Sequence, residues 1–394
     1  MRRIGRILAV AMVMLLAPSL VAAKARYAVK TIGDVVQLRD NKADVIVSVL
    51  TPVSNAYEMV VKGENVIRMP IKSVDDMRAR PGLNGIPLLA PFANRLDQTA
   101  FFANGRKYNF DLEQETVRGP IPIHGYVTGA NAWKVVEAKA DAKSAWVTSR
   151  LEFYRNPLYM AQFPFAHTLT MTYRVSDGGL EVHTRIDNLS IEPMPVSIGF
   201  HPYFQLTDSN RKDWTINVGA KTNWLLAPTK VPTGETQSSD AFFGGDHHQV
   251  PLSRFADRTL DDVFTDLERD ANGRASVSLS GAHQHLTVTV GPKFKAVLVY
   301  STIAPPPPPA VPAPGTPPRP QAPAAVPVSV GPPIPLSAKN TAPAPPERGF
   351  VAFEPMVGIT DAMNLAQKGL YKELQSVPPG GVWEESFWVR PTGY

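Results

Sequence analysis

Cysteine is absent from the 394-residue chain. This absence excludes disulfides, thiolate metal sites and thiol catalysis. The chain also lacks a basic stripe with interleaved aromatic residues, and three units of its formal net charge of +5 come from Arg2, Arg3 and Arg6 at the N-terminus. We therefore do not expect a nucleic-acid partner.

Long apolar runs are also missing beyond the N-terminus, so no later segment is expected to cross a membrane. The N-terminus itself has a positive stretch over residues 1–6, an apolar core over 7–16 and a small-residue cleavage site at Val21-Ala22-Ala23. This order is typical of a secretory signal peptide over residues 1–23. An uncleaved anchor is the alternative, although the apolar core is short for one. We expect a periplasmic or secreted protein with no integral membrane span after cleavage.

Helical periodicity is scarce, and only residues 74–80 are expected to form one or two helical turns. Alternation of apolar and polar residues predicts strands instead, and Asn104-Gly105 predicts a hairpin turn. The alternating stretches are residues 35–39, 43–50, 144–154, 167–175, 180–188, 194–198, 296–300, 350–353 and 380–390. So many strands predict an all-β fold, either a sandwich or a barrel.

Residues 304–346 differ in composition from the rest of the chain. They hold nearly half of its 39 prolines, few charges and no aromatic residue. Such a stretch is expected to be extended, flexible and unable to pack a core. We expect a single β-sandwich domain over residues 24–394, interrupted by this tract as a tolerated insertion. A docking site for a proline-reading partner is the alternative.

Two residues are candidates for acid–base chemistry. His201 lies in an aromatic stretch directly after a predicted strand, and Glu354 ends an apolar strand before a proline. Aromatic neighbours and a carboxylate suit an imidazole for proton transfer to a sugar, and burial raises the pKa of a carboxyl. A core histidine and a strand-end ion pair are the competing interpretations.

Three further residues are candidates for binding polar groups. Arg95 follows an apolar run and is either a surface cation or a fork of donors in a pocket. His124 precedes a glycine, which permits close approach of a ligand, but it could be an ordinary loop histidine. Asp261 and Asp262 point to opposite faces of an extended segment, so only one can reach a shared site. A solvated turn is the alternative for this pair.

Two histidine clusters, His247-His248 and His283-Gln284-His285, raise the question of a metal. Neither has further ligands at a defensible spacing, so we expect surface or strand residues there and no metal site.

Taken in order, these motifs resemble the aldose 1-epimerase (galactose mutarotase) family from about residue 30 to 390. The residues that carry the resemblance are Asn94-Arg95, His124-Gly125, Gly199-Phe200-His201-Pro202-Tyr203-Phe204, Leu260-Asp261-Asp262-Val263-Phe264 and Phe353-Glu354-Pro355-Met356 with Asp361-Ala362-Met363-Asn364. The resemblance implies a large antiparallel β-sandwich. It also implies Glu354 as catalytic base, His201 as acid, and sugar contacts from Arg95, His124 and Asp261. We therefore expect Glu354 and His201 to face each other across a gap the size of a hexose ring.

The activity that this resemblance implies is interconversion of the α and β anomers of a free aldohexose, with no cofactor. A non-catalytic carbohydrate-binding or scaffold protein on the same fold is the main alternative. An epimerase for phosphorylated hexoses would need an extra cationic cluster, and a glycoside hydrolase would need two carboxyls flanking the bond. The proline tract lies just before the Glu354 strand, which leaves the preferred sugar open.

Overall fold

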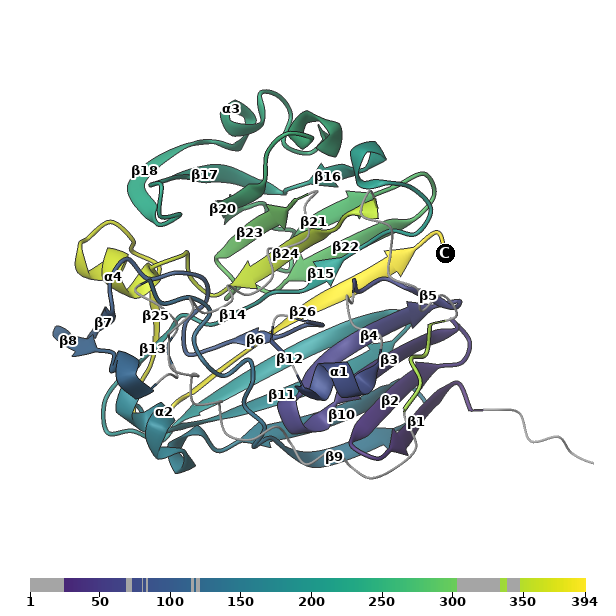
Figure 1. Ribbon diagram of the computed structural model, residues 1–394, viewed down its shortest axis with the longest axis horizontal. Helices are drawn as coiled ribbons and strands as arrows, with labels where there is room; N and C mark the ends of the chain where they lie inside the picture. The colour runs from purple at the N-terminus through teal and green to yellow at the C-terminus, as the bar shows by residue number, and fades with distance from the viewer. Residues whose placement is uncertain are drawn as a thin grey trace, which may run out of the picture.

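The computed structural model describes residues 25–68, 73–79, 81–82, 84–114, 117, 121–302, 334–338 and 348–394. The predicted signal peptide therefore lies outside the described residues. Strands dominate the chain, as the alternating patterns predict, and the described helices are short (Figure 1). The α-helices are α1 (Val74–Ala79), α2 (Pro157–Gln162), α3 (Ser239–Phe243) and α4 (Ala362–Gln367). None of these described helices has the length and apolar character needed to cross a membrane.

The strands form two large sheets, one of intermediate size and two small pairs. The nine-stranded sheet contains, in spatial order, β19 (Val250–Pro251), β16 (Thr215–Asn217), β21 (Ala275–Ser280), β22 (His285–Val290), β26 (Val382–Thr392), β12 (Gly179–Asn188), β11 (His167–Ser176), β10 (Ala145–Leu151) and β9 (Lys134–Ala140). The eight-stranded sheet contains β18 (Pro232–Ser238), β17 (Ala220–Leu226), β20 (Leu260–Leu267), β23 (Ala296–Ser301), β24 (Val351–Met356), β14 (Gly199–Phe200) and β6 (Leu88–Leu89), with β15 (Tyr203–Phe204) also paired to β24.

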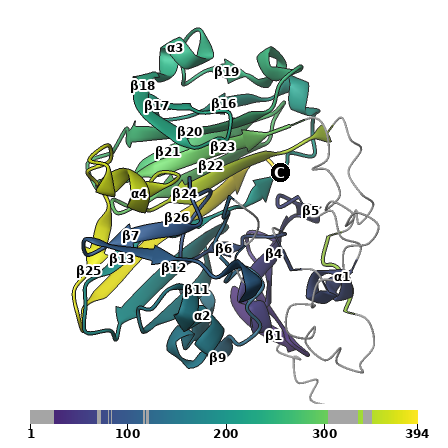
Figure 2. The ribbon, with the colours of Figure 1, turned by 60° about the vertical axis from the view of Figure 1, so that its left-hand side comes forward.

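The five-stranded sheet contains β1 (Tyr27–Ile32), β2 (Val35–Asp40), β3 (Val45–Leu50), β4 (Asn55–Val61) and β5 (Glu64–Asn65). The two small pairs are β7 (Ala100–Ala103) with β8 (Arg106–Asn109) and β13 (Met194–Val196) with β25 (Gln375–Val377). Both the five-stranded and the eight-stranded sheet pack on the nine-stranded one, over different parts of it (Figures 1 and 2). This is the antiparallel β-sandwich that the sequence predicts.

One continuous apolar core joins the layers. Strand β11 shows how the sequence builds it, because Leu169, Met171, Tyr173 and Val175 are all buried on one face while Thr170 is partly exposed on the other. Between sheets, the rings of Phe200 and Phe387 lie 4.8 Å apart. The predicted hairpin is also present, with the Asn104-Gly105 turn in left-handed backbone conformation between β7 and β8.

A part of the proline tract differs from its predicted behaviour. Residues 334–338 pack on the five-stranded sheet, where Ile334 and Ala338 are buried. The backbone N–H of Ser337 donates to both carboxylate oxygens of Glu58, at 3.0 and 3.2 Å. Glu58 is fully buried on β4, and burial raises its pKa. A few apolar side chains and one backbone donor therefore suffice to hold this short segment, although its composition predicts no packing. The rest of the tract lies outside the described residues.

Candidate active site

The eight-stranded sheet brings acidic and aromatic side chains to one face. Asp261 on β20 is the direct partner of Tyr300 on β23, and Glu354 on β24 faces Leu298, two residues before Tyr300. Because side chains alternate along a strand, Asp261, Tyr300 and Glu354 share this face. The opposite face of the sheet carries residues of the main apolar core, such as Phe353. The polar groups therefore gather on the face that is turned away from this core.

Asp261 and Asp262 are separated by the same alternation. Asp261 accepts a bond from Arg95, while Asp262 pairs in register with Val299 on the other face. Asp262 instead lines a cavity of about 400 Å³ together with Trp224, Lys230 and other residues of the β17–β18 region. Burial raises the pKa of Asp262. Of the two predicted alternatives, it is therefore Asp261 whose carboxylate lies with the other candidate residues.

His201 and Glu354 are in direct contact. His201 lies between β14 and β15, both of which pair with β24, so its ring is held over the strand that carries Glu354. The Nε2 atom of His201 lies 3.0 Å from Oε1 of Glu354, and the two side chains are 5% and 1% exposed. An imidazole and a carboxylate facing each other across a hexose ring were expected. The two side chains instead form a contiguous pair, because β14 and β15, which flank His201, both pair with β24.

The environment of this pair perturbs the carboxyl. Burial raises the pKa of Glu354, against the opposing effect of the adjacent His201 imidazole. Two atoms of the pair, Oε2 of Glu354 and Nδ1 of His201, are buried and have no hydrogen-bond partner within the described part of the chain. A buried acceptor without a donor is costly in a folded protein, and such groups are characteristic of ligand sites.

Aromatic rings lie around the pair, and a half-buried cation, Arg68, lies beside them. Tyr203 stacks on His201 with 4.5 Å between ring centroids, and its hydroxyl is 3.5 Å from Nε2. Tyr300 lies edge-on to His201 at 6.0 Å. Arg68 lies over the ring of Phe350 at 4.8 Å, and burial lowers its pKa. Arg68 and Tyr300 were not singled out from the sequence, and Tyr203 was named only as part of the motif around His201. Tyr203 could have been assigned to the site because it lies two positions from His201 on the same extended segment.

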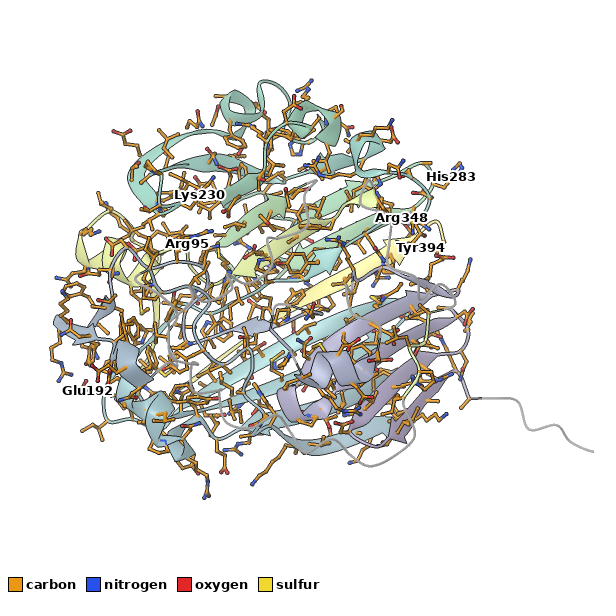
Figure 3. The ribbon with its side chains drawn as sticks, viewed as in Figure 1. Arg95, Glu192, Lys230, His283, Arg348 and Tyr394 are labelled. Atoms are coloured by element: carbon orange, nitrogen blue, oxygen red, sulfur yellow. The ribbon has the colours of Figure 1, made fainter. Side chains whose placement is uncertain are left out.

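Arg95 and Asp261 form an ion pair beside this cluster. Arg95 donates through one terminal nitrogen to Asp261 at 3.1 Å and through the other to the side-chain oxygen of Asn94 at 3.1 Å. Arg95 is labelled in Figure 3. The side chains of Arg95 and Asp261 are 23% and 13% exposed, so the pair remains reachable from solvent. The guanidinium is therefore fixed in orientation by two acceptors while its remaining N–H donors stay available.

His124 joins the cluster from a separate loop. Its backbone N–H donates to the carbonyl of Asn94 at 2.8 Å, and its ring lies edge-on to His201 at 5.2 Å. Both Asn94 and His124 adopt left-handed backbone conformation. Gly125 is also left-handed, and a Cβ there would stand 2.1 Å from the carbonyl oxygen of Ala90. The two loops thus approach so closely that only glycine fits at this position.

The five residues singled out from the sequence are therefore brought together: His201, Glu354, Arg95, His124 and Asp261. The arrangement places an imidazole against a carboxylate, with a guanidinium, a second imidazole and a further carboxylate beside them. No group with metal-ligand spacing occurs among them; within the described residues such a group is found only at Asp246, His247 and His248.

Comparisons with known proteins agree with this architecture. The family model described as aldose 1-epimerase matches residues 58–309. A galactose mutarotase-like protein from Clostridium acetobutylicum has a similar structure, with a TM-score of 0.70 and 17% identity over 93% of this chain and 98% of that one. Galactose 1-epimerase from Lactobacillus acidophilus aligns with a TM-score of 0.66 and 14% identity over 94% and 98% of the two chains.

A curated relative is closer in sequence but matches over a shorter length. The uncharacterized protein YphB of Escherichia coli (strain K12) is 28% identical over 137 residues, which is 35% of this chain and 41% of YphB. The match thus spans less than half of that relative. The family model covers well over half of this chain, and the solved relatives share its fold nearly end to end. Because the family model matches residues 58–309 and the β-sandwich agrees with the solved relatives, the chain belongs to the aldose 1-epimerase family.

Proposed function

We propose that this protein interconverts the α and β anomers of a free aldohexose, with Glu354 as base and His201 as acid. The observation that carries the proposal is the 3.0 Å contact between the two buried groups. The C1 hydroxyl and the ring oxygen of a pyranose are both bonded to C1, so the groups that exchange protons with them must be neighbours. A contiguous carboxylate and imidazole meets that requirement.

The proposed reaction begins at the unpartnered Oε2 of Glu354, which takes the proton from the C1 hydroxyl. The C1–O1 bond becomes a carbonyl, the bond between C1 and the ring oxygen breaks, and His201 Nε2 gives a proton to the ring oxygen. After rotation about C1–C2, closure on the other face reverses both transfers. The raised pKa of Glu354 makes it a stronger base than an exposed carboxylate.

The neighbouring residues have supporting roles in this proposal. Tyr203 holds the plane of the imidazole by stacking, and because burial raises the pKa of its phenol it stays neutral beside Glu354. The free N–H groups of Arg95 and the oxygens of Asp261 would bind sugar hydroxyls, and His124 would contribute a ring nitrogen. These contacts would position the hemiacetal against the Glu354–His201 pair. A leader over residues 1–23 would place this activity outside the cytoplasm.

The test is anomerisation of freshly dissolved α-D-glucose and α-D-galactose, followed by polarimetry or NMR exchange. We expect the wild type to accelerate at least one of them, and Glu354→Gln to lose roughly a hundred- to ten-thousand-fold of that acceleration. Glu235→Gln, an exposed glutamate on β18, is the matched control and should retain full activity. Sugar binding without acceleration by the wild type would overturn the catalytic proposal and favour a carbohydrate-binding protein.

A further inference from the structure

A second cluster of titratable side chains lies away from the candidate sugar site, and it comes from two separate segments of the chain. His247 and His248 lie between α3 and β19, and Glu268 directly follows β20. The Glu268 carboxylate is 3.1 Å from Nε2 of His248 and 3.9 Å from Nε2 of His247. The two imidazole rings are 4.1 Å apart between centroids. Both Nε2 atoms thus approach one carboxylate.

The other ring nitrogens are held by acceptors. Nδ1 of His247 lies 2.7 Å from Oδ1 of Asp240, and Nδ1 of His248 lies 3.1 Å from Oδ1 of Asn217. The orientation of the Asn217 amide is fixed, because the same oxygen accepts the N–H of Gly219 at 2.9 Å. An acceptor at Nδ1 keeps the proton there and leaves the lone pair on Nε2. This is the arrangement that orients histidines as metal ligands.

With its proton on Nδ1, His248 would turn the Nε2 lone pair toward the Glu268 carboxylate, a second acceptor, so a cation between them would satisfy both groups. Nε2 of His247 is buried and has no hydrogen-bond partner in the described part of the chain, and the side chain is only 10% exposed. A buried polar atom without a partner is destabilising unless a ligand satisfies it. His248 is 40% exposed, so an ion could enter from solvent past its ring.

We propose that His247 Nε2, His248 Nε2 and the Glu268 carboxylate bind a Zn²⁺ ion, with water or Asp246 completing the coordination. Tetrahedral ligands at zinc stand roughly 3.3 Å from one another, given bonds of about 2.1 Å. His248 Nε2 lies 3.1 Å from Oε2 of Glu268, and His247 Nε2 lies 3.9 Å from Oε1, so each nitrogen–oxygen distance is near that value. A carboxylate of Asp246 is near enough to take part, because one ligand atom each from Asp246, His247 and His248 lie within 4.8 Å of one another.

The site is independent of the sugar chemistry. Glu268 follows the end of β20 opposite to Asp261, which places it roughly 20 Å away along the strand. The ion would tie the α3–β19 segment to the C-terminal end of β20, an interior strand of the eight-stranded sheet. From the sequence, no metal site was expected at His247-His248, because no further ligand occurs at a suitable spacing. Glu268 and the two Nδ1 partners come from elsewhere in the chain, which spacing along the sequence does not reveal.

The experiment is titration of the full chain, purified without a polyhistidine tag and stripped with chelator, with Zn²⁺ and in parallel with Mg²⁺. We expect one Zn²⁺ per chain by calorimetry, a rise in unfolding temperature with Zn²⁺, and no response to Mg²⁺, because imidazole ligands disfavour it. Crystals soaked in Zn²⁺ should give an anomalous peak between the two Nε2 atoms.

Variants decide whether the ion binds where we propose. His248→Gln and Glu268→Gln should each weaken Zn²⁺ binding at least tenfold, and Asp240→Asn, which loosens the support of His247, by about 10- to 100-fold. His283→Gln changes an exposed histidine in the β21–β22 turn and should bind like the wild type (Figure 3). Circular dichroism checks that each variant is folded. Unchanged Zn²⁺ affinity in folded His248→Gln, or the absence of a stoichiometric site in the wild type, would overturn the proposal.

Discussion

Asp361 is a buried carboxyl next to the Arg95 loop, and its replacement by asparagine should change how stability depends on pH. Its side chain accepts from the N–H of Asp97 at 3.2 Å and from the amide of Asn364 at 2.8 Å. Its own N–H donates to the carbonyl of Arg95 at 3.0 Å. Asp361 is 1% exposed, and burial, reinforced by the charge of Asp97, raises its pKa from 3.8 to about 7.

The direction of the pH effect on the unfolding free energy follows from which state binds the Asp361 proton more tightly. The folded chain keeps the Asp361 proton up to about pH 7, while the unfolded chain releases it near 3.8. The contribution of the protonated Asp361 to the unfolding free energy is therefore complete below about pH 4 and is lost as the pH rises to about 7. One pKa unit corresponds to 1.36 kcal/mol, so the whole window is worth about 4 kcal/mol and the part between pH 5 and pH 8 about 3 kcal/mol.

The assay is urea unfolding at pH 5 and pH 8. Asp361→Asn cannot titrate, so the fall in unfolding free energy between these pH values should be about 3 kcal/mol smaller than in the wild type. Glu58, Asp262 and Glu354, whose pKa values are also raised, act in the same direction in both proteins and cancel in the comparison.

The control for this test is an exposed aspartate. Asp141 has a pKa lowered by backbone N–H groups of its turn, so it is already ionised at pH 5. Asp141→Asn should shift the unfolding free energy equally at both pH values. An unchanged pH 5 to pH 8 difference in Asp361→Asn would refute the argument that burial dominates at this carboxyl.

Three further outcomes follow from the geometry. Arg95→Lys keeps the charge but loses the planar fork, so kcat/KM for anomerisation should fall about ten- to one-hundred-fold. Gly125→Ala puts a Cβ against the carbonyl of Ala90 in a left-handed backbone, and thermal unfolding should show a loss of about 2 to 4 kcal/mol. Ser337→Pro removes the N–H that binds the buried carboxylate of Glu58; we expect destabilisation by about 1 to 3 kcal/mol in urea unfolding, and equal stability would contradict the anchoring role.

The strands could be predicted from the sequence because alternation is a local signal. Residues such as Leu169 and Met171 show it directly, and the same period of two separates Asp261 from Asp262. The contact between His201 and Glu354 could not be predicted, because it depends on β14 and β15 both pairing with β24. Only the family resemblance linked these two distant residues.

Features that rest on contacts between distant segments were missed for the same reason. Arg68 reaches the site because its segment runs beside Tyr203, to whose carbonyl its N–H donates at 2.9 Å. Residues 334–338 pack through Ser337 and the buried Glu58, nearly 280 positions earlier in the chain. Composition predicts only the conformation that a segment favours in isolation. A buried acceptor in a distant part of the chain, such as Glu58, can hold the segment in place regardless of that preference.

The hairpin between β23 and β24 has a practical consequence for engineering. Tyr300 and Ala352 are direct partners, so the ends of the two strands are already held together beside the junction between Thr302 and Arg348. A foreign module spliced into this junction would be displayed at the end of the two strands, close to Tyr300. Grafts of this kind should keep residues 334–338 intact, because they cover the buried carboxylate of Glu58. The protein thus offers a cassette position at the end of the strands that carry Tyr300 and Glu354.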